Sequence, residues 1–415
     1  MGPKALLAIG WRNIWRNRRR TIITLCSIVF GSFLAVLLTG IGDSTYGNMI
    51  DTAARMGNGH VTVQHPTHHE APSPKRYVKG AFEIADKLGK DAEVITAVPR
   101  ISGQMMVSTA GESRGTAFIA IDPARENKDT LLALKGLTEG ELFKADDANG
   151  IVLGATLAKH LGAKIGRKVV YTMTDRHGEI FTGLGRVRGL VKTGSPGIDN
   201  GLCLLPIQAV QKALDYGPKD ATLVAVVAAD QRRSAAIAQR LRGDVSEQHA
   251  VKTWHQTMAS LASFIDMKLS GTAFIEGLLM ILVAAGIFNA LLVSVMERRR
   301  ELGILTALGW SRLQLFGMVM AESFWLAIVG LISAALVTAG PYYHLSTKGV
   351  DMSEVYGTNS ATVANVTMDA TLYVKVHPDN FVFLVVAVLL ATMASGLIPA
   401  WQAGRVDPVE SIKLV

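Results

Sequence analysis

Long apolar runs divide the chain into parts of two kinds. Four runs stand out, at residues 21–42, 272–296, 313–340 and 381–403. The first and last carry no charge, and the two inner runs carry one acidic residue each, Glu276 and Glu322. Because about 20 apolar residues in a helix cross the hydrocarbon core of a bilayer, each run is long enough to span a membrane. The pattern therefore predicts four transmembrane helices at these positions.

The first run follows a basic stretch, as the apolar part of a signal peptide would. Its 22 residues exceed the usual signal length of about 7–15, and no Ala-x-Ala-like cleavage site follows Gly42. We expect residues 21–42 to be an uncleaved first span.

Residues 43–271 mix strand-like alternation with short helical patterns. Predicted strands are residues 59–64, 94–98, 104–108, 117–121, 168–173, 186–191 and 224–228. Predicted helices are residues 82–88, 155–161, into which residues 150–153 lead, and 231–241. Asp175–Gly178 lies between two strand-like runs and is typical of a hairpin turn. Helical patterns at residues 43–56 and 254–269 flank this region and lead to the first two spans. The expected fold is an α-helical membrane protein with four transmembrane helices plus a large α/β extracytoplasmic (periplasmic) domain.

The composition agrees with this class, because 49% of the residues are hydrophobic and only 18% are charged. The net charge is +8, and basic residues gather beside the spans, in residues 1–20, 297–312 and 404–415. By the positive-inside rule these three regions are cytoplasmic, and residues 43–271 and 341–380 lie on the other side. The even number of spans agrees, so we expect a multi-pass protein of the inner (plasma) membrane with both termini in the cytoplasm. The membrane topology then accounts for the basic charge, and no nucleic-acid partner is expected.

The first 20 residues have the pattern of an interfacial helix. Leu7, Trp11, Ile14 and Trp15 fall on one helical face, and basic residues fall on the others. Tryptophan suits the headgroup level of a bilayer and arginine suits anionic lipid, so membrane lipid is the expected partner of this helix. The alternative is a basic cluster that only sets topology.

Motifs for catalysis are missing from the sequence. The only Gly-Lys pair, Gly89–Lys90, is followed by Asp91 where a nucleotide-binding loop needs Ser or Thr. The histidine-rich residues 60–70 match no recognised ligand spacing of a metal site, and Cys26 and Cys203 are too far apart in the predicted layout to pair. We expect no catalytic site, no metal and no cofactor, and no ATP hydrolysis by this chain.

The linker between the second and third spans, residues 297–312, has charged ends with small and apolar residues between them. Gly309 is a suitable stop for a short helix, and Ser311 is a suitable start for the next one. Such a helix is a good docking element for a groove in a partner protein. A plain charged hairpin that only connects two spans would have a similar sequence pattern.

This linker closely resembles the signature cytoplasmic loop of the FtsX/MacB-type ABC transporter permeases, roughly E-R-x-R-E-I-G-x-L-x-A-L-G. The matching residues are Glu297, Arg298, Arg300, Glu301, Leu302, Gly303, Leu305, Ala307, Leu308 and Gly309, with Leu302 in place of the usual Ile. The opening Arg12–Thr21 and the tail Pro399–Ser411 resemble the corresponding ends of the same family.

The resemblance implies a permease subunit of the mechanotransmission type. It would pair with a second permease, as a homodimer or heterodimer, and with a dimer of separate ATPase subunits that contact the ten matching residues. Gly59–Gln64, Ala97–Arg100 and Ile121–Pro123 are similar to the lipoprotein-releasing permeases of the LolC/LolE type, which implies a lipoprotein substrate. A MacB-like efflux or secretion permease and an FtsX-like transmembrane signal transducer are the alternatives.

Two polar residues inside predicted spans, Asn289 and Glu322, are expected to face protein, because a charge near the bilayer centre costs a few kcal/mol. They would either form hydrogen bonds between helices or contribute to a gate or substrate contact.

Overall fold

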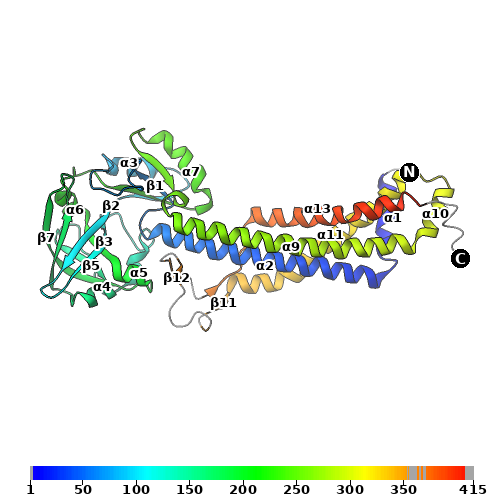
Figure 1. Cartoon of the computed structure of the whole chain (residues 1–415), viewed down its shortest axis with the longest axis horizontal. Coiled ribbons are helices and arrows are strands. Elements are labelled where there is room, and N and C mark those ends of the chain that lie inside the picture. Colours follow the sequence, from blue (N-terminus) through cyan, green and yellow to red (C-terminus); the bar gives the residue numbers. More distant parts are fainter. Residues whose placement is uncertain (1–2, 353, 355–361, 364–365, 368–370, 407–415) are drawn as a thin grey trace. The chain divides into compact units, whose positions relative to one another are not determined.

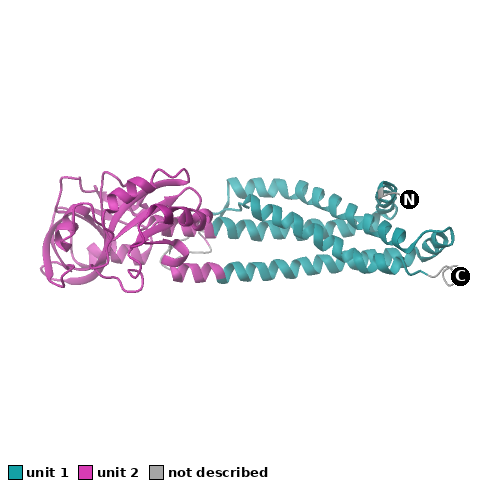
Figure 2. Cartoon of the chain, turned by 90° about the horizontal axis from the view of Figure 1, so that it is seen from above, with its two compact units in different colours: residues 1–45, 267–351, 371–415 teal, residues 46–266, 352–370 magenta. Residues whose placement is uncertain are grey.

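The computed structural model describes residues 3–352, 354, 362–363, 366–367 and 371–406. The chain forms two compact units, coloured in Figure 2. The helical unit comprises residues 1–45, 267–351 and 371–415, and the α/β unit comprises residues 46–266 and 352–370. Most of the predicted tail 404–415 and part of the predicted loop 341–380 lie outside the described residues.

Within the described residues, four helices are long and apolar enough to cross a membrane, which confirms the predicted fold class. They are α2 (Arg18–Arg55), α9 (Ala259–Glu297), α11 (Arg312–Thr347) and α13 (Pro378–Ala403), labelled in Figure 1. Three of them extend well beyond the predicted spans, because hydrophobicity marks only the apolar part of a helix and the backbone continues through polar residues. The helical patterns at residues 43–56 and 254–269 thus belong largely to α2 and α9, with α8 (Trp254–Thr257) separated from α9 at Met258.

The N-terminal helix α1 (Pro3–Ile14) packs against α11 and ends six residues before the predicted end at residue 20. The indole Nε1 of Trp325 donates a hydrogen bond to the Leu7 carbonyl at 2.9 Å. A Cβ at Gly10 would lie 2.9 Å from the backbone of Ala321, so this close approach of two helices requires glycine. Trp11 keeps 40% of its surface exposed.

The remaining helices are α3 (Ala81–Leu88), α4 (Ala155–His160), α5 (Pro196–Gly201), α6 (Ile207–Leu214), α7 (Ser234–Leu241) and α10 (Arg299–Ala307). The strands of the main sheet are β1 (Val61–Gln64), β2 (Val94–Ser108), β3 (Ser113–Ile121), β4 (Leu137–Gly140), β5 (Gly150–Gly154), β6 (Lys168–Thr174), β7 (Ile180–Val191), β8 (Leu202–Pro206), β9 (Leu223–Ala228) and β10 (Ala250–Thr253). Two short ladders pair β11 (Val350–Asp351) with β14 (Thr371–Leu372), and β12 (Thr362–Val363) with β13 (Val366–Thr367).

The 10-stranded sheet of the α/β unit has the order β10-β1-β9-β2-β3-β8-β5-β7-β4, and β6 pairs with both β2 and β7. These pairings close β2, β3, β8, β5, β7 and β6 into a ring, which leaves no free edge within it. The first half of β2 pairs with β9 and the second half with β3 and β6, so this strand belongs to both parts of the sheet.

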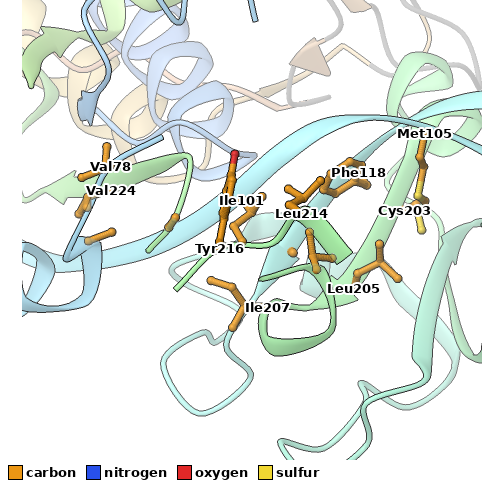
Figure 3. Close-up of a cluster of buried hydrophobic side chains, with 14 of the residues drawn as sticks. Val78, Ile101, Met105, Phe118, Cys203, Leu205, Ile207, Leu214, Tyr216 and Val224 are labelled. Atoms are coloured by element: carbon orange, nitrogen blue, oxygen red, sulfur yellow. The ribbon is translucent and has the colours of Figure 1, made fainter. Parts of the chain in front are cut away.

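A continuous core of buried apolar side chains fills the α/β unit. Figure 3 shows part of it, including Ile101 and Met105 of β2, Phe118 of β3 and Leu205 of β8. Most predicted elements of this unit are present, and the turn at Asp175–Gly178 joins β6 to β7. Some details were wrong. The separate strands predicted at 94–98 and 104–108 are the single strand β2, and the elements β4, β5, α5, β8, α6 and β10 were not predicted.

Candidate functional site

The linker predicted as a docking element folds into the short helix α10, between the two long helices α9 and α11. Leu308 closes α10, and Gly309 follows with φ of 95°, a left-handed conformation that favours glycine. The side chains of Ser311 and Gln314 then form a capping box at the start of α11. The predicted stop at Gly309 and start at Ser311 are therefore confirmed.

Ion pairs tie the first residues of this linker to the N-terminal part of the chain. Arg16, in the turn between α1 and α2, binds Glu301 of α10 with both guanidinium nitrogens, one of them at 2.7 Å. Arg20 of α2 donates to Glu297 at 3.0 Å and to Ser294 at 2.8 Å. The hydrogen bond from Arg16 lowers the pKa of Glu301, so this carboxylate stays charged at neutral pH. These contacts join residues that are more than 270 positions apart in the sequence.

A second, more buried cluster surrounds Glu322 of α11. Its Oε1 accepts hydrogen bonds from Asn13 Nδ2 at 2.6 Å and from Arg298 Nη1 at 2.8 Å. The side chain of Glu322 is 6% exposed and that of Arg298 is 17% exposed. Arg298 also donates from Nε to Glu301 at 3.2 Å, so one guanidinium bridges the carboxylates of α10 and α11. The expectation that Glu322 faces protein is confirmed.

The ten predicted docking residues separate into three groups. Leu302 and Gly303 are buried, and Leu302 packs in a cluster with Leu315 and Met318 of α11. Leu305 packs in part against the same cluster. Ion pairs occupy Glu297, Arg298 and Glu301. The exposed group is Arg300, Ala307, Leu308 and Gly309.

Four exposed residues, Arg300, Ile304, Ala307 and Leu308, lie at i, i+4, i+7 and i+8 and so share one side of the linker helix and its cap. Ile304 is 44% exposed and Leu308 is 74% exposed. We call these four residues the α10 face. Ile304 was not among the predicted residues, although its spacing of four from both Arg300 and Leu308 would have placed it there.

The expectation that Asn289 faces protein was wrong for a single chain. Asn289 of α9 is exposed, and within the described part of the chain its amide has no hydrogen-bond partner. It lines a shallow groove between α2 and α9 that also contains Thr24, Ser27 and Gly286. The physical reason is that α9 is largely uncovered within the described part of the chain, since the apolar 18-residue window of this helix is only 22% buried.

Two family descriptions match most of the sequence. The MacB-like periplasmic core domain matches residues 21–244, and the FtsX-like permease C-terminal matches residues 273–408. Among solved structures, the periplasmic region of MacB from Actinobacillus actinomycetemcomitans matches with a TM-score of 0.36 and 14% identity, over 52% of this chain and 98% of that structure.

Curated relatives cover nearly the whole chain. The macrolide export ATP-binding/permease protein MacB of Nitrobacter winogradskyi is 23% identical over 95% of this chain, which spans only 58% of that protein. The lipoprotein-releasing system transmembrane protein LolC of Xylella fastidiosa is 25% identical over 98% of both chains. With its four apolar helices and its α/β unit, the chain belongs to the FtsX/MacB-type family of ABC transporter permeases.

Proposed function

We propose that this chain is the permease subunit of a mechanotransmission ABC transporter that releases lipoproteins from the outer leaflet of the inner membrane. ATP would be hydrolysed by a separate pair of ATPase subunits. The observation that carries the proposal is the α10 face, a largely apolar exposed surface on a short helix. Ion pairs join residues 297–301 to the α1–α2 turn, to α2 and to α11.

The topology follows the positive-inside rule. Residues 1–20, 297–312 and 404–415 would be cytoplasmic, with both termini inside, and residues 43–271 and 341–380 would be extracytoplasmic. The spans would be the apolar parts of α2, α9, α11 and α13, at residues 21–42, 272–296, 313–340 and 381–403.

The α10 face would insert into a groove of the ATPase subunit. Ile304 and Leu308 would be buried in the contact, and Arg300 would lie at its edge, where charges keep some water. Movement of α10 would pull on α2 through the pairs of Arg16 and Arg20, and on α11 through Arg298. Because α2 and α9 each continue as one helix into the α/β unit, a tilt of these helices would move that unit. No path for substrate across the whole membrane is needed.

A second permease would cover the groove between α2 and α9. An amide exposed to lipid is unfavourable, since nothing in the hydrocarbon replaces its bonds to water. Small residues such as Gly286 and Ser27 allow two helices to approach closely, and Asn289 would then find a partner on the second subunit.

A lipoprotein substrate is supported by the LolC relative, because the match covers 98% of both chains. Extracting acyl chains from a bilayer costs about 0.8 kcal/mol per CH₂, which explains the need for ATP. The second candidate is efflux or secretion, which the MacB relative favours because that relative is a macrolide export protein.

Depletion of this protein in cells tests the proposal. Lipoproteins should accumulate in the inner membrane, and the wild-type chain should restore their release only when the partner ATPase is active. Normal lipoprotein sorting in depleted cells would exclude lipoprotein release as the function and would favour efflux.

A further inference from the structure

One side of strand β2 lacks a strand partner along part of its length. On this side, residues 94–100 pair with β9 and residues 106–108 pair with β6. Between them, residues 101–105 pair only with β3, on the opposite side of the strand. In an antiparallel ladder every second residue directs both its N–H and its C=O away from the partner strand. Within the described part of the chain, β2 therefore presents backbone donors and acceptors without a strand partner over a gap of about 17 Å.

A cavity of about 340 Å³ lies along this gap, within the α/β unit. Residues 102–104 of β2 line it, and the loop at residues 68–74 contributes a second wall. The loop is anchored, because the Tyr216 hydroxyl donates a hydrogen bond to the Pro74 carbonyl. The volume falls within the usual range for ligand sites, about 300–1,000 Å³. The space beside the unpaired side of β2 is therefore a formed site.

The side chains around this cavity favour an uncharged occupant. Asp, Glu, Lys and Arg are absent from the described residues that line it. Its apolar lining includes Phe118 of β3, Met173 of β6 and Leu214 of α6, and Figure 3 labels Phe118 and Leu214. A charged group would lose its bonds to water here without gaining an ionic partner. An uncharged residue with an apolar side chain fits these walls.

His68 supplies a buried acceptor that lacks a donor. The residue lines the cavity and is 9% exposed. Burial lowers the pKa of His68, so the ring is neutral at pH 7, and the ring donates its one N–H to the Arg76 carbonyl. The other nitrogen, Nδ1, has no hydrogen-bond partner in the part of the chain that the structure describes. Since buried polar atoms normally have a partner, this nitrogen indicates that a ligand with an N–H group binds here.

We propose that this cavity binds a short extended segment of a partner protein, which adds to the unpaired side of β2 at residues 101–105. The backbone of the segment exchanges hydrogen bonds with β2, as in other cases of strand addition. One of its N–H groups donates to His68 Nδ1, and one uncharged apolar side chain packs against Phe118, Met173 and Leu214. With the topology proposed above, the partner is extracytoplasmic. The site is separate from the α10 face and does not depend on which substrate the transporter releases.

Fluorescence anisotropy with the full chain in phospholipid nanodiscs tests this proposal. The probe is a fluorescein-labelled peptide amide of sequence Gly-Ser-Leu-Ser-Gly, which is uncharged along its backbone and carries one apolar side chain. The wild-type protein should bind it saturably and at least tenfold more tightly than the same peptide with Asp in place of Leu. Unlabelled N-acetylleucinamide, which has the side chain but little backbone, should compete only at a concentration at least tenfold above that of the unlabelled peptide.

Thr174→Trp fills the rim of the cavity at an exposed position and should weaken binding at least tenfold. Thr182→Trp is the matched control, because Thr182 is exposed on the neighbouring strand β7 and does not line the cavity, and it should bind like the wild type. His68→Gln keeps a donor for the Arg76 carbonyl but lacks Nδ1, and it should weaken binding at least fivefold.

Absence of saturable binding by the wild type would overturn the proposal. Equal binding by Thr174→Trp and Thr182→Trp, or unchanged binding by His68→Gln, would also overturn it. Competition by N-acetylleucinamide as strong as that of the peptide would show a site for free small molecules and would exclude strand addition.

Discussion

Removal of Arg298 should destabilise the protein far more than removal of the charge of its partner Glu322. Arg298→Met would leave the Glu322 carboxylate, 6% exposed, with only Asn13 as a hydrogen-bond donor. Breaking one partner of a buried ion pair costs about 3–5 kcal/mol. Since the Arg298 side chain keeps 17% exposure, we expect the lower end of that range, about 3 kcal/mol.

Glu322→Gln is expected to cost less, about 1–2 kcal/mol, because the uncharged amide oxygen still accepts from Asn13 and Arg298 keeps Glu301 as a partner. The double variant Arg298→Met/Glu322→Gln contains no unpaired buried charge. It should therefore be more stable than Arg298→Met alone, with a coupling of at least about 1.5 kcal/mol between the two sites.

The measurement is a double-mutant cycle of unfolding free energy in lipid bicelles. Arg300→Met is the matched control, because Arg300 is exposed and has no ion-pair partner in the described residues, and it should change stability by less than about 0.5 kcal/mol. If the two single losses simply add in the double variant, Arg298 and Glu322 do not form the coupled pair described above.

Three further predictions concern separate parts of the chain. Arg100 of β2 is 0% exposed and pairs with Glu126 at 2.6 Å, so Arg100→Met should lower the stability of the α/β unit by about 3–5 kcal/mol. The full-length protein should then unfold at a lower temperature. An unchanged unfolding temperature would contradict the pairing. Burial lowers the pKa of His68 below its ordinary value of about 6.5, so the unfolded state binds more protons than the folded state in this range. The stability of the protein should therefore fall as pH decreases from about 6.5 toward the lowered pKa. His68→Asn should reduce this loss of stability between about pH 7.5 and pH 5, and an identical pH profile of stability would refute the prediction. Leu308→Asp should reduce co-purification of the ATPase subunit at least tenfold without lowering thermal stability, whereas Arg299→Asp, exposed but off the α10 face, should not.

The spans and the linker helix were predictable because their signals are local. An apolar run of sufficient length identifies a spanning helix regardless of its neighbours. Gly309 and Ser311 identify helix ends by backbone conformation and side-chain capping within a few residues. The strand β8 was missed because it is a short run that ends at Pro206, a residue disfavoured inside strands, and its buried residues add no alternation to reveal it.

The contacts around α10 could not be predicted, because they join distant parts of the chain. Arg16 and Glu301 are 285 positions apart, and nothing local shows that they pair. The sequence motif also did not distinguish Gly303, which is buried, from Leu308, which is exposed. A substitution at Gly303 would disturb packing within the chain, so Leu308 is the better position for testing docking. For Asn289, periodicity alone does not reveal which side of α9 the chain itself covers.

We propose that work from ATP hydrolysis reaches a lipoprotein through the α10 face. The most direct measurement is ATP-dependent release of a labelled lipoprotein from proteoliposomes that contain this chain, its partner permease and the ATPase. We predict release with the wild type, a loss of at least tenfold with Leu308→Asp, and wild-type release with Arg299→Asp. Absence of release from the wild-type complex, or release that Leu308→Asp leaves unchanged, would contradict the account.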